Sequence, residues 1–564
     1  MEEERPWFSS YPKEVPRHLD YPAVPLTGFL AKAAAECPDR VATIFFGGKL
    51  TYRRLETHVR RFAAGLQQLG VKPGDRVAVM LPNCPQAVIA YLAVLTAGAV
   101  VVQTNPMYKE RELRHQLADS GATQMVALDL VYPRVAAVTS DTRLQHTVVT
   151  GIQDFLPVPL RWLYPLKQRL EKKRPAVDYG PRVHRFLDVL AGGGAAGQEV
   201  STGPGDLALL QYTGGTTGVS KGVMLTHANL VANVSQIAQW MYGFKAGTPR
   251  ILAALPLFHS YGLTACMNFS LHAAGTLILT PKFDVEEVLK LIQRHRPTVF
   301  PGAPTMYVAL NHHPRVKEYD LSSIETCISG GAALPVEVQE TFERLTGGKL
   351  VEGYGLTEAS PVTHCTPLWG KRKNGSIGVP WPDTDCRIVD GSGVDVAPGE
   401  IGELLIKGPQ VMRGYWNHPE ETAATLKDGW LYTGDLARMD EDGFFYIVGR
   451  KKEMIIAGGF NIYPRDVEEV LFEHPAIAEA SVIGVPDPYR GETVKAYIVL
   501  KQGASLTAEE VDRFCRERLA AYKVPRIVEF RTSLPKSMVG KVLRRELLEE
   551  EAARLETSGP GEGG

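Results

Sequence analysis

The run YTGGTTGVSKG, at residues 212–222, constrains the fold of this chain more than any other stretch. It follows the apolar residues 207–210, which predict a short buried strand ending in a glycine-rich loop. Glycines let successive backbone N–H groups turn toward one anion, and threonine hydroxyls and a lysine add donors and charge. A Walker A loop would have serine or threonine after the lysine, whereas Lys221 is followed by Gly222. We therefore predict a polyphosphate loop of another kind; a surface loop rich in turn residues is the weaker alternative. The residues expected to bind phosphate are Thr213, Gly214, Gly215, Thr216, Thr217, Gly218 and Lys221.

Helices and strands are predicted to alternate on both sides of this loop, over residues 50–119 and 226–345. Such alternation is typical of an α/β fold, in which helices cover both faces of parallel sheets. Residues 384–403 are expected to be rich in β-structure, and the pattern beyond them predicts a small α+β domain. A chain of 564 residues is also too long for one hydrophobic core. We expect an N-terminal domain at 1–449, with helix-covered sheets and a β-rich subdomain, and a smaller domain at 450–564 that ends in a disordered tail.

The composition excludes several classes of partner. With 62 basic and 63 acidic residues, the net charge of −1 provides no positive field for nucleic acid. Seven cysteines lie far apart without a metal-binding pair, so a reduced cytoplasm is the expected compartment. The first residues lack the apolar core of a signal peptide. The uncharged stretch 87–102 is shorter than the ~20 residues of a spanning helix and instead predicts a helix followed by a buried strand.

The phosphate-loop run resembles that of the adenylate-forming superfamily, which includes acyl-CoA synthetases, firefly luciferase and the adenylation domains of peptide synthetases. A glycine and Ser220 stand where the usual motif has serine and proline, and both departures are similar to those of bacterial long-chain fatty acid CoA ligases. The run QTNPMY, at 103–108, resembles the same ligases. The resemblance covers nearly the whole chain. It implies ATP-dependent activation of a long-chain fatty acid to acyl-AMP and transfer to CoA, with Mg²⁺ on the nucleotide and with AMP and pyrophosphate as products.

The run EGYGLTE, at 352–358, contains the residue types that a nucleotide needs. Tyr354 offers an aromatic face for the base, Thr357 a hydroxyl for a phosphate, and Glu358 a carboxylate for Mg²⁺. Matching residues have these roles in the family. We expect Thr217 to share the metal with Glu358 and both to serve catalysis. The other residues of this run expected at the nucleotide are Glu352, Gly353 and Gly355.

A strip of small residues contains Gly331 and Ala332, which leave room for a flat ligand against the backbone. In the family the equivalent strip borders the adenine and the acyl pocket. Close packing of a helix on a strand would require the same small residues, so both explanations stay open.

Other residues gain a role only from the resemblance. Asp435, at the end of WLYTGD, would bind the ribose hydroxyls, and Arg450 would contact the same adenylate. Lys541 would hold the carboxylate and the α-phosphate during adenylation. His259 would lie beside the acyl carboxylate, although a structural histidine is an equally good explanation. At Leu263 some long-chain relatives have a gating tryptophan, so a gate of that kind is not expected.

The resemblance also divides the reaction between two arrangements of a mobile small domain. Lys452 would be the hinge about which this domain turns between the half-reactions. The loop of Gly458 and Gly459 would then line the passage for the pantetheine thiol. No covalent enzyme intermediate and no catalytic cysteine are required.

Residues 154–185 mix aromatic and aliphatic side chains with eight basic residues, a composition that suits the surface of an anionic membrane. Prolines interrupt the stretch and argue against one long amphipathic helix. A helical excursion packed on the domain is therefore favoured, and peripheral contact with the inner face of the membrane is the alternative. The sequence leaves open whether the chain forms a homodimer.

Alternative functions remain at this point. A medium-chain or aryl-carboxylate CoA ligase would have the same motifs. An acyl-AMP ligase typically carries an insertion that blocks domain rotation, and none is visible between residues 346 and 449. A luciferase-like oxygenase could use the same adenylate. A nucleotide-binding scaffold with a dead site would be expected to have lost some of the charged residues named above.

Overall fold

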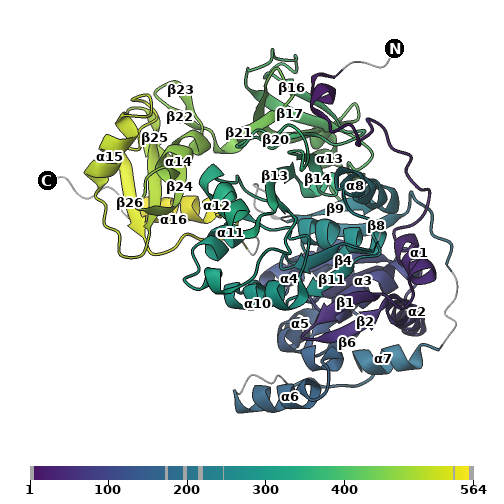
Figure 1. Cartoon of the computed structure of the whole chain (residues 1–564). Helices are drawn as coiled ribbons and strands as arrows, with labels where there is room; N and C mark the ends of the chain where they lie inside the picture. Colours follow the sequence, from purple (N-terminus) through teal and green to yellow (C-terminus); the bar gives the residue numbers. More distant parts are fainter. Residues whose placement is uncertain are drawn as a thin grey trace.

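The computed structural model describes residues 5–171, 176–194, 200–213, 220–245, 247–537 and 540–557. A large α/β domain and a smaller C-terminal domain lie side by side, the latter at the upper left of the view (Figure 1). This confirms the expected fold class. The tail that was expected to be disordered lies largely outside the described residues.

The first sheet of the large domain carries the phosphate loop. Its strands, in spatial order, are β18 (Gly414–Tyr415), β9 (Lys221–Thr226), β8 (Leu207–Thr213), β4 (Val100–Gln103), β3 (Arg76–Met80), β5 (Gln124–Leu128), β6 (His146–Thr150) and β7 (Val183–Arg185). From β8 to β7 the strands are parallel, whereas β9 and β18 are antiparallel to their neighbours. The predicted strand before the glycines is therefore confirmed. Thr213, the last residue of β8, lies at the carboxyl edge of the parallel strands, where open α/β sheets bind ligands.

The second sheet carries the EGYGLTE run. One part of it contains β2 (Gly48–Thr51), β1 (Val41–Phe45), β11 (Thr276–Leu279) and β10 (Arg250–Ala253). The other part contains β12 (Thr326–Ser329), β13 (Lys349–Gly355), β14 (Val362–Cys365) and β15 (Val379–Pro380). Val299 bridges Ile251 on one side and Thr326 on the other, so it joins the two parts.

Helices cover these sheets and fill the space between them. They are α1 (Gly28–Glu36), α2 (Tyr52–Gln68), α3 (Pro85–Thr96), α4 (Glu110–Ser120), α5 (Tyr132–Thr139), α7 (Phe186–Gly192), α8 (His227–Trp240), α9 (Phe269–His272), α10 (Val285–His295), α11 (Pro304–Asn311) and α12 (Val336–Thr346). The uncharged stretch 87–102 forms α3 and β4, and α3 is buried along almost its whole length. None of the described helices is long and apolar enough to cross a membrane.

A β-rich subdomain follows, as the sequence predicts. It consists of β16 (Asp385–Val389), β17 (Gly402–Lys407), β20 (Trp430–Met439), β19 (Leu426–Lys427) and β21 (Phe445–Arg450), with α13 (Pro419–Thr425) beside it. The long strand β20 presents Asp435, and its partner β21 ends at Arg450.

The C-terminal domain has its own sheet and its own core. The sheet is formed by β23 (Phe460–Ile462), β22 (Ile455–Ala457), β25 (Gly491–Leu500), β24 (Ile477–Asp487) and β26 (Ile527–Arg531), and the helices are α14 (Pro464–Phe472), α15 (Ala508–Arg516) and α16 (Arg544–Thr557). Val467, Leu471, Val482 and Ile498 pack together in this core.

Residues 154–185 differ from expectation. The excursion contains a helix, α6 (Leu160–Leu170), which continues through Pro165 although a proline nitrogen cannot donate to the preceding turn. Trp162, Leu163, Leu166 and Leu170 on this helix are exposed instead of being packed on the domain. Figure 1 shows α6 at the lower edge of the large domain.

Candidate active site

The phosphate loop connects two strands that pair directly. Thr213 at the end of β8 faces Lys221 at the start of β9 across the antiparallel ladder. The ring of Tyr212 fits against Gly222, where a Cβ atom would lie 3.1 Å from it and would crowd the ring. Thr213 and Lys221 therefore hold the two ends of the loop in register. The expected phosphate ligands Gly214, Gly215, Thr216, Thr217 and Gly218 lie outside the described residues.

Lys221 and Glu358 come together around a tyrosine that sequence reasoning missed. Tyr415 on β18 donates a hydrogen bond from its hydroxyl to Oε1 of Glu358 at 2.8 Å. The Nζ atom of Lys221 lies 5.3 Å from the Tyr415 ring centre and 3.5 Å from Oε1 of Glu421. Burial, followed by the Glu358 charge, raises the pKa of Tyr415, which therefore stays a hydrogen-bond donor. The lysine predicted to bind phosphate and the carboxylate predicted to bind a metal thus lie beside one phenol.

Thr357 lies next to the segment that contains His259. The hydroxyls of Thr357 and Ser260 are 3.2 Å apart, and Ser260 is a second residue that no motif signalled. His259 accepts a hydrogen bond at Nδ1 from the backbone N–H of Tyr261 at 3.3 Å. Burial, and then the positive charge of Lys541, lower the pKa of His259 to about 4. The imidazole is therefore neutral at pH 7, and it lies close enough to Lys541 to be influenced by its charge.

Asp435 is the centre of the predicted ribose site. Tyr354 donates to its Oδ2 at 2.5 Å, and Nε of Arg450 lies 3.0 Å from its Oδ1. Asp435 and Arg450 are paired residues of the β20–β21 ladder, which fixes their contact. Asp435 raises the pKa of Arg450, and burial with the Asp435 charge raises the pKa of Tyr354. Residues from motifs far apart in sequence therefore meet at one carboxylate.

Lys541 reaches this cluster from the C-terminal domain. The positive charge of Arg450, followed by desolvation, lowers the pKa of Lys541 to about 8, while Asp435 opposes the shift. The adjacent Gly540 packs closely on α11 of the large domain, where a Cβ atom would lie 2.0 Å from Oγ1 of Thr305. Lys541 itself remains exposed to solvent in this arrangement. The loop holding Lys541 is thus docked against the large domain.

The strip at Gly331 and Ala332 is exposed, and Gly331 has a φ of +86°, which favours glycine. Beneath it, Glu352 is buried, and its Oε2 accepts the backbone N–H of Leu334 at 3.2 Å. Burial raises the pKa of Glu352 to about 7. Through this hydrogen bond, Glu352 links the strip to β13.

Gly353 and Gly355 are constrained by packing. A Cβ atom on Gly353 would lie 2.9 Å from Cγ2 of Ile328, and one on Gly355 would lie 2.1 Å from the carbonyl oxygen of Pro361. These two glycines let β13 approach its neighbours closely, so that Tyr354 between them can reach Asp435.

The segment expected to be the hinge directly follows β21. Lys452 is exposed in a short 3₁₀ helix, Lys451–Glu453. Its neighbours make ion pairs: Lys451 with Glu403 at 2.9 Å, and Glu453 with Arg544 at 2.5 Å. Lys452 is therefore flanked by one contact to the large domain and one within the small domain.

Gly458 and Gly459 form the turn of the β22–β23 hairpin. Their φ values of +60° and +84° are those of a tight hairpin turn that favours glycine at both positions. Both are exposed, and no atom lies within 4 Å of a Cβ placed on Gly459. The structure brings Lys541 near Arg450 and Asp435 and leaves this turn open to solvent.

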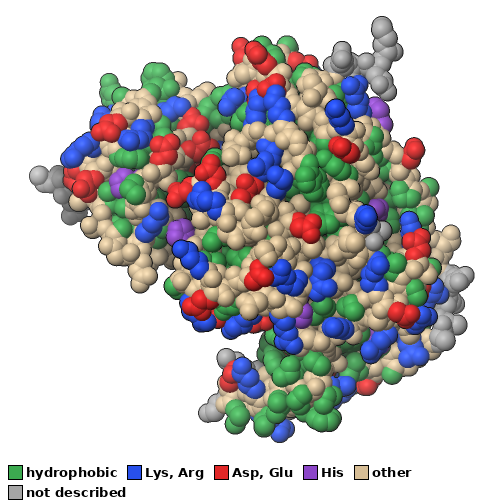
Figure 2. All heavy atoms as spheres, viewed as in Figure 1, with side chains coloured by type: hydrophobic (Ala, Val, Ile, Leu, Met, Phe, Trp, Pro, Cys, Tyr) green, Lys and Arg blue, Asp and Glu red, His purple; other side chains and the backbone are tan. Residues whose placement is uncertain are grey.

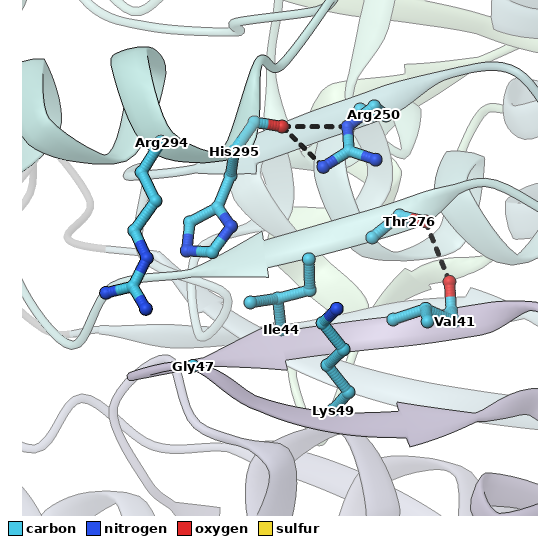
Figure 3. A pocket seen from close by; sticks show the side chains of 8 residues that line it. All are labelled: Val41, Ile44, Gly47, Lys49, Arg250, Thr276, Arg294 and His295. Atoms are coloured by element: carbon cyan, nitrogen blue, oxygen red, sulfur yellow. Dashed lines mark hydrogen bonds between the residues drawn. The ribbon is translucent and has the colours of Figure 1, made fainter.

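One hollow in the structure lies apart from these motifs. It has a volume of about 430 Å³ and lies where β1, β2, β10 and β11 meet the end of α10 (Figure 3). Its basic lining residues are Lys49, Arg250 and Arg294, and Arg250 donates from Nε to the carbonyl of His295 at 2.8 Å. None of its lining residues belongs to the motifs above, so the candidate site is defined by their convergence at Asp435 and Glu358.

Comparisons with known proteins identify the family. Residues 30–416 match the family model described as AMP-binding enzyme, and residues 466–541 match the AMP-binding enzyme C-terminal domain. A long-chain-fatty-acid CoA ligase of Bacillus subtilis (strain 168) is 54% identical, covering 98% of this chain and 99% of the relative.

Solved structures show the same likeness. ATP-bound MatB from Rhodopseudomonas palustris has a TM-score of 0.82 and 31% identity, covering 93% of this chain and 99% of that one. An anthranilate CoA ligase, AuaEII, in complex with anthranoyl-AMP has a TM-score of 0.84 and 27% identity, covering 95% and 99%. Sequence, motif geometry and fold together place this chain in the family of AMP-binding, adenylate-forming enzymes.

Proposed function

We propose that the chain is an AMP-forming ligase that joins a long-chain fatty acid to CoA. The observation that carries this proposal is the meeting of Tyr354, Asp435, Arg450 and Lys541 at one place, because each comes from a different motif of an adenylate-forming enzyme. The 54% identity to a long-chain-fatty-acid CoA ligase supports the substrate class. ATP and CoA are the co-substrates of such an enzyme.

In the first half-reaction, a carboxylate oxygen of the fatty acid attacks the α-phosphorus of ATP, and pyrophosphate leaves. Positioning and charge neutralisation supply most of the acceleration in such a displacement. Lys541 would hold the carboxylate and the α-phosphate together, while Arg450 contacts the same adenylate and Asp435 binds the ribose hydroxyls. Lys221, with Thr213 and the glycine-rich loop, would hold the outer phosphates. Tyr354, Gly331 and Ala332 would border the base, Thr357 would donate to a phosphate, and neutral His259 would lie beside the acyl carboxylate.

The proposed metal site fits the residues present. Among the described residues no group of three His, Cys, Asp or Glu side chains could hold an ion alone. Oxygen ligands from Glu358, Thr217 and the nucleotide phosphates would suit Mg²⁺, which is commonly held by one or two carboxylates together with phosphates and water. Bound there, Mg²⁺ would neutralise the charge of the leaving pyrophosphate. Tyr415 would orient the Glu358 carboxylate through its hydrogen bond.

In the second half-reaction, the CoA thiol loses its proton and attacks the acyl carbonyl, so that AMP leaves. We propose that the small domain, with its boundary between residues 449 and 450, turns at Lys452 and withdraws Lys541. The turn of Gly458 and Gly459, exposed in the present arrangement, would then line the passage for the thiol. We assign the enzyme to a reducing cytoplasm, since all seven cysteines are free in the structure.

The test is release of AMP and pyrophosphate from Mg·ATP with acetate, octanoate, palmitate, oleate and a cinnamate, with and without CoA. CoA-dependent AMP turnover that is highest with palmitate and oleate supports the proposal. Highest turnover with the cinnamate would favour an aryl-CoA ligase, the class suggested by the likeness to AuaEII. AMP release independent of CoA would indicate an acyl-AMP ligase, and no release with any acid would indicate a nucleotide-binding scaffold.

A further inference from the structure

Helix α6 presents most of its large apolar side chains to solvent, whereas Gln168 and the half-buried Tyr164 face the protein. Trp162, Leu163, Leu166 and Leu170 are 70%, 53%, 54% and 78% exposed, whereas Gln168 is 7% exposed. A helix on the surface of a globular domain normally buries its apolar stripe. Here the orientation is reversed, so burial within this chain does not account for the apolar stripe.

Positive charges border the stripe on both sides. At about 100° per residue, the apolar side chains centre on the direction opposite Gln168, and Lys167 and Arg169 lie on either flank. The helix contains three basic residues and no acidic residue. Lys167 lies only loosely against Glu171, at 3.8 Å. Long basic side chains at the edge of an apolar stripe can reach lipid phosphates while the stripe enters the acyl boundary.

Figure 2 shows hydrophobic side chains gathered at the lower edge of the molecule, where Figure 1 places α6, with basic side chains around them. Val158, just before the helix, is also exposed and extends the apolar surface. The C-terminal domain lies at the upper left of the same view, away from α6. A flat surface docked on α6 would therefore leave the small domain free to turn.

We propose that α6 is a docking helix that binds an anionic phospholipid bilayer, with Trp162, Leu163, Leu166 and Leu170 in the interface and with Lys167 and Arg169 against lipid phosphates. A second copy of the chain is a less suitable binding partner for the exposed face of α6. An 11-residue helix is only about 16 Å long, and one face of it offers far less than the roughly 800 Å² per partner of a stable interface. A bilayer needs no complementary protein surface and matches the charge.

This inference extends the proposed function, since long-chain fatty acids partition into bilayers and a docked ligase would meet its substrate there. Its test does not depend on catalysis. Vesicle binding is measured with the full chain in the absence of ATP, CoA and fatty acid. A chain that lacks ligase activity would still bind vesicles, and an active ligase without a docking helix would not.

The first experiment is flotation with phosphatidylcholine vesicles and with vesicles of equal parts phosphatidylcholine and phosphatidylglycerol. The wild type is expected to bind the anionic vesicles preferentially and reversibly, as a short interfacial helix does. Trp162→Ser/Leu166→Ser should lower the partition coefficient by at least about tenfold, because two large apolar side chains no longer leave water. The matched control is Val394→Ser/Ile401→Ser, which removes exposed apolar side chains from the β16–β17 connection and should bind like the wild type.

The second experiment separates charge from apolar insertion. Lys167→Gln/Arg169→Gln should weaken binding to the anionic vesicles several-fold and reduce its sensitivity to salt, with little change on neutral vesicles. Trp162 should shift its fluorescence to shorter wavelength on binding and be quenched by spin-labelled lipid. Trp162→Phe should abolish that spectral change while still binding.

Equal binding of wild type and Trp162→Ser/Leu166→Ser would overturn the proposal, as would equal binding to neutral and anionic vesicles. Sedimentation of the lipid-free protein tests whether a second copy of the chain covers α6 instead of a bilayer. If the wild type is a dimer and Trp162→Ser/Leu166→Ser a monomer, the face is an interface between copies and the docking helix is refuted. An unchanged mass for both, together with the vesicle result, supports it.

Discussion

Asp435 holds Arg450 by one carboxylate oxygen, at 3.0 Å, while its other oxygen accepts the hydroxyl of Tyr354 at 2.5 Å. The carboxylate is thus oriented by two partners within the protein. It also compensates part of the positive charge that Arg450 imposes on Lys541. Asp435 therefore influences the residue proposed to promote adenylation as well as the proposed ribose site.

Lys541→Ala is expected to lower the rate of acyl-AMP formation by about 10² to 10³-fold, because a charge aimed at the reacting phosphate is lost. ATP binding and the transfer of a preformed acyl-adenylate to CoA should be much less affected. Single-turnover assays of each half-reaction measure this difference. Lys536→Ala is the control in the same loop, since Lys536 pairs with Glu479 at 2.6 Å within the small domain. Equal loss in both half-reactions would contradict the role assigned to Lys541.

The pH dependence of adenylation should report Lys541. With a pKa of about 8, the lysine is mostly charged at pH 7 and loses its proton as the pH rises through 8. The value of kcat/KM for adenylation should therefore fall above about pH 8. Arg450→Met removes the main cause of the lowered Lys541 pKa, so the decline in kcat/KM should begin at a higher pH. Asp435→Asn removes the charge that opposes this shift, so the decline should begin at a lower pH. If the decline in kcat/KM shifted in the same direction in both variants, a group other than Lys541 would be titrating.

Tyr415→Phe should raise the Mg²⁺ concentration for half-maximal activity several-fold, because the Glu358 carboxylate loses the donor that orients it. The phenyl ring beside Lys221 is retained, so the KM for ATP should change less. The measurement is a Mg²⁺ titration at saturating ATP. Tyr446→Phe is the matched control, since it removes a similar bond, to Asp440 at 3.0 Å, away from the site. An identical Mg²⁺ response in the two variants would contradict the role proposed for Tyr415.

Gly540→Ala should suppress adenylation because its Cβ would collide with Thr305 and displace the loop that carries Lys541. Thr305→Ala removes the atom nearest the collision and should restore part of the activity in the double variant. The positive φ of +74° adds a strain of about 1 kcal/mol that Thr305→Ala cannot relieve. A double-mutant cycle on single-turnover rates separates the two effects. Additive losses would show that the loop does not dock on α11.

Glu352 should make stability depend on pH. Its pKa is about 7 in the folded protein and ordinary, near 4.5, in the unfolded chain, so the folded state retains the proton in this range. Stability contributed by the neutral form is complete below about pH 4.5 and declines as the pH rises toward 7. The total decline is on the order of 3 kcal/mol. Glu352→Gln should flatten the dependence of the melting temperature between pH 5 and 8; an unchanged slope would mean that other groups cause it.

Elements with a complete local signal were predicted well. Within the predicted alternation at 226–345 lies α10, where Asp284 caps the first turn by accepting the backbone N–H of Glu287 at 3.0 Å. Thr226 likewise caps α8, with Asn229 completing the capping box. In both helices the capping residue and the apolar periodicity lie within one short stretch, so both signals can be recognised from the sequence alone.

Tyr415 and Ser260 were missed because their roles depend on long-range placement. Tyr415 reaches Glu358 only because β18 pairs with β9, a partner far earlier in the chain. Ser260 meets Thr357 through the approach of two separate segments. Lys541 had no local signal either, and only the family resemblance joined it to Arg450. Local patterns predict elements, whereas the site depends on how distant elements assemble.

The dependence of the site on a loop of the C-terminal domain has a consequence for biosynthesis. Lys221, Glu358 and Asp435 precede the small domain and Arg450 lies at its first position, so the proposed nucleotide-binding groups can leave the ribosome and fold before Lys541 is synthesised. The growing chain would bind ATP without activating a fatty acid. Adenylation would begin only after the second domain has folded and its loop has reached Thr305, so that no reactive acyl-adenylate is formed on a half-made enzyme.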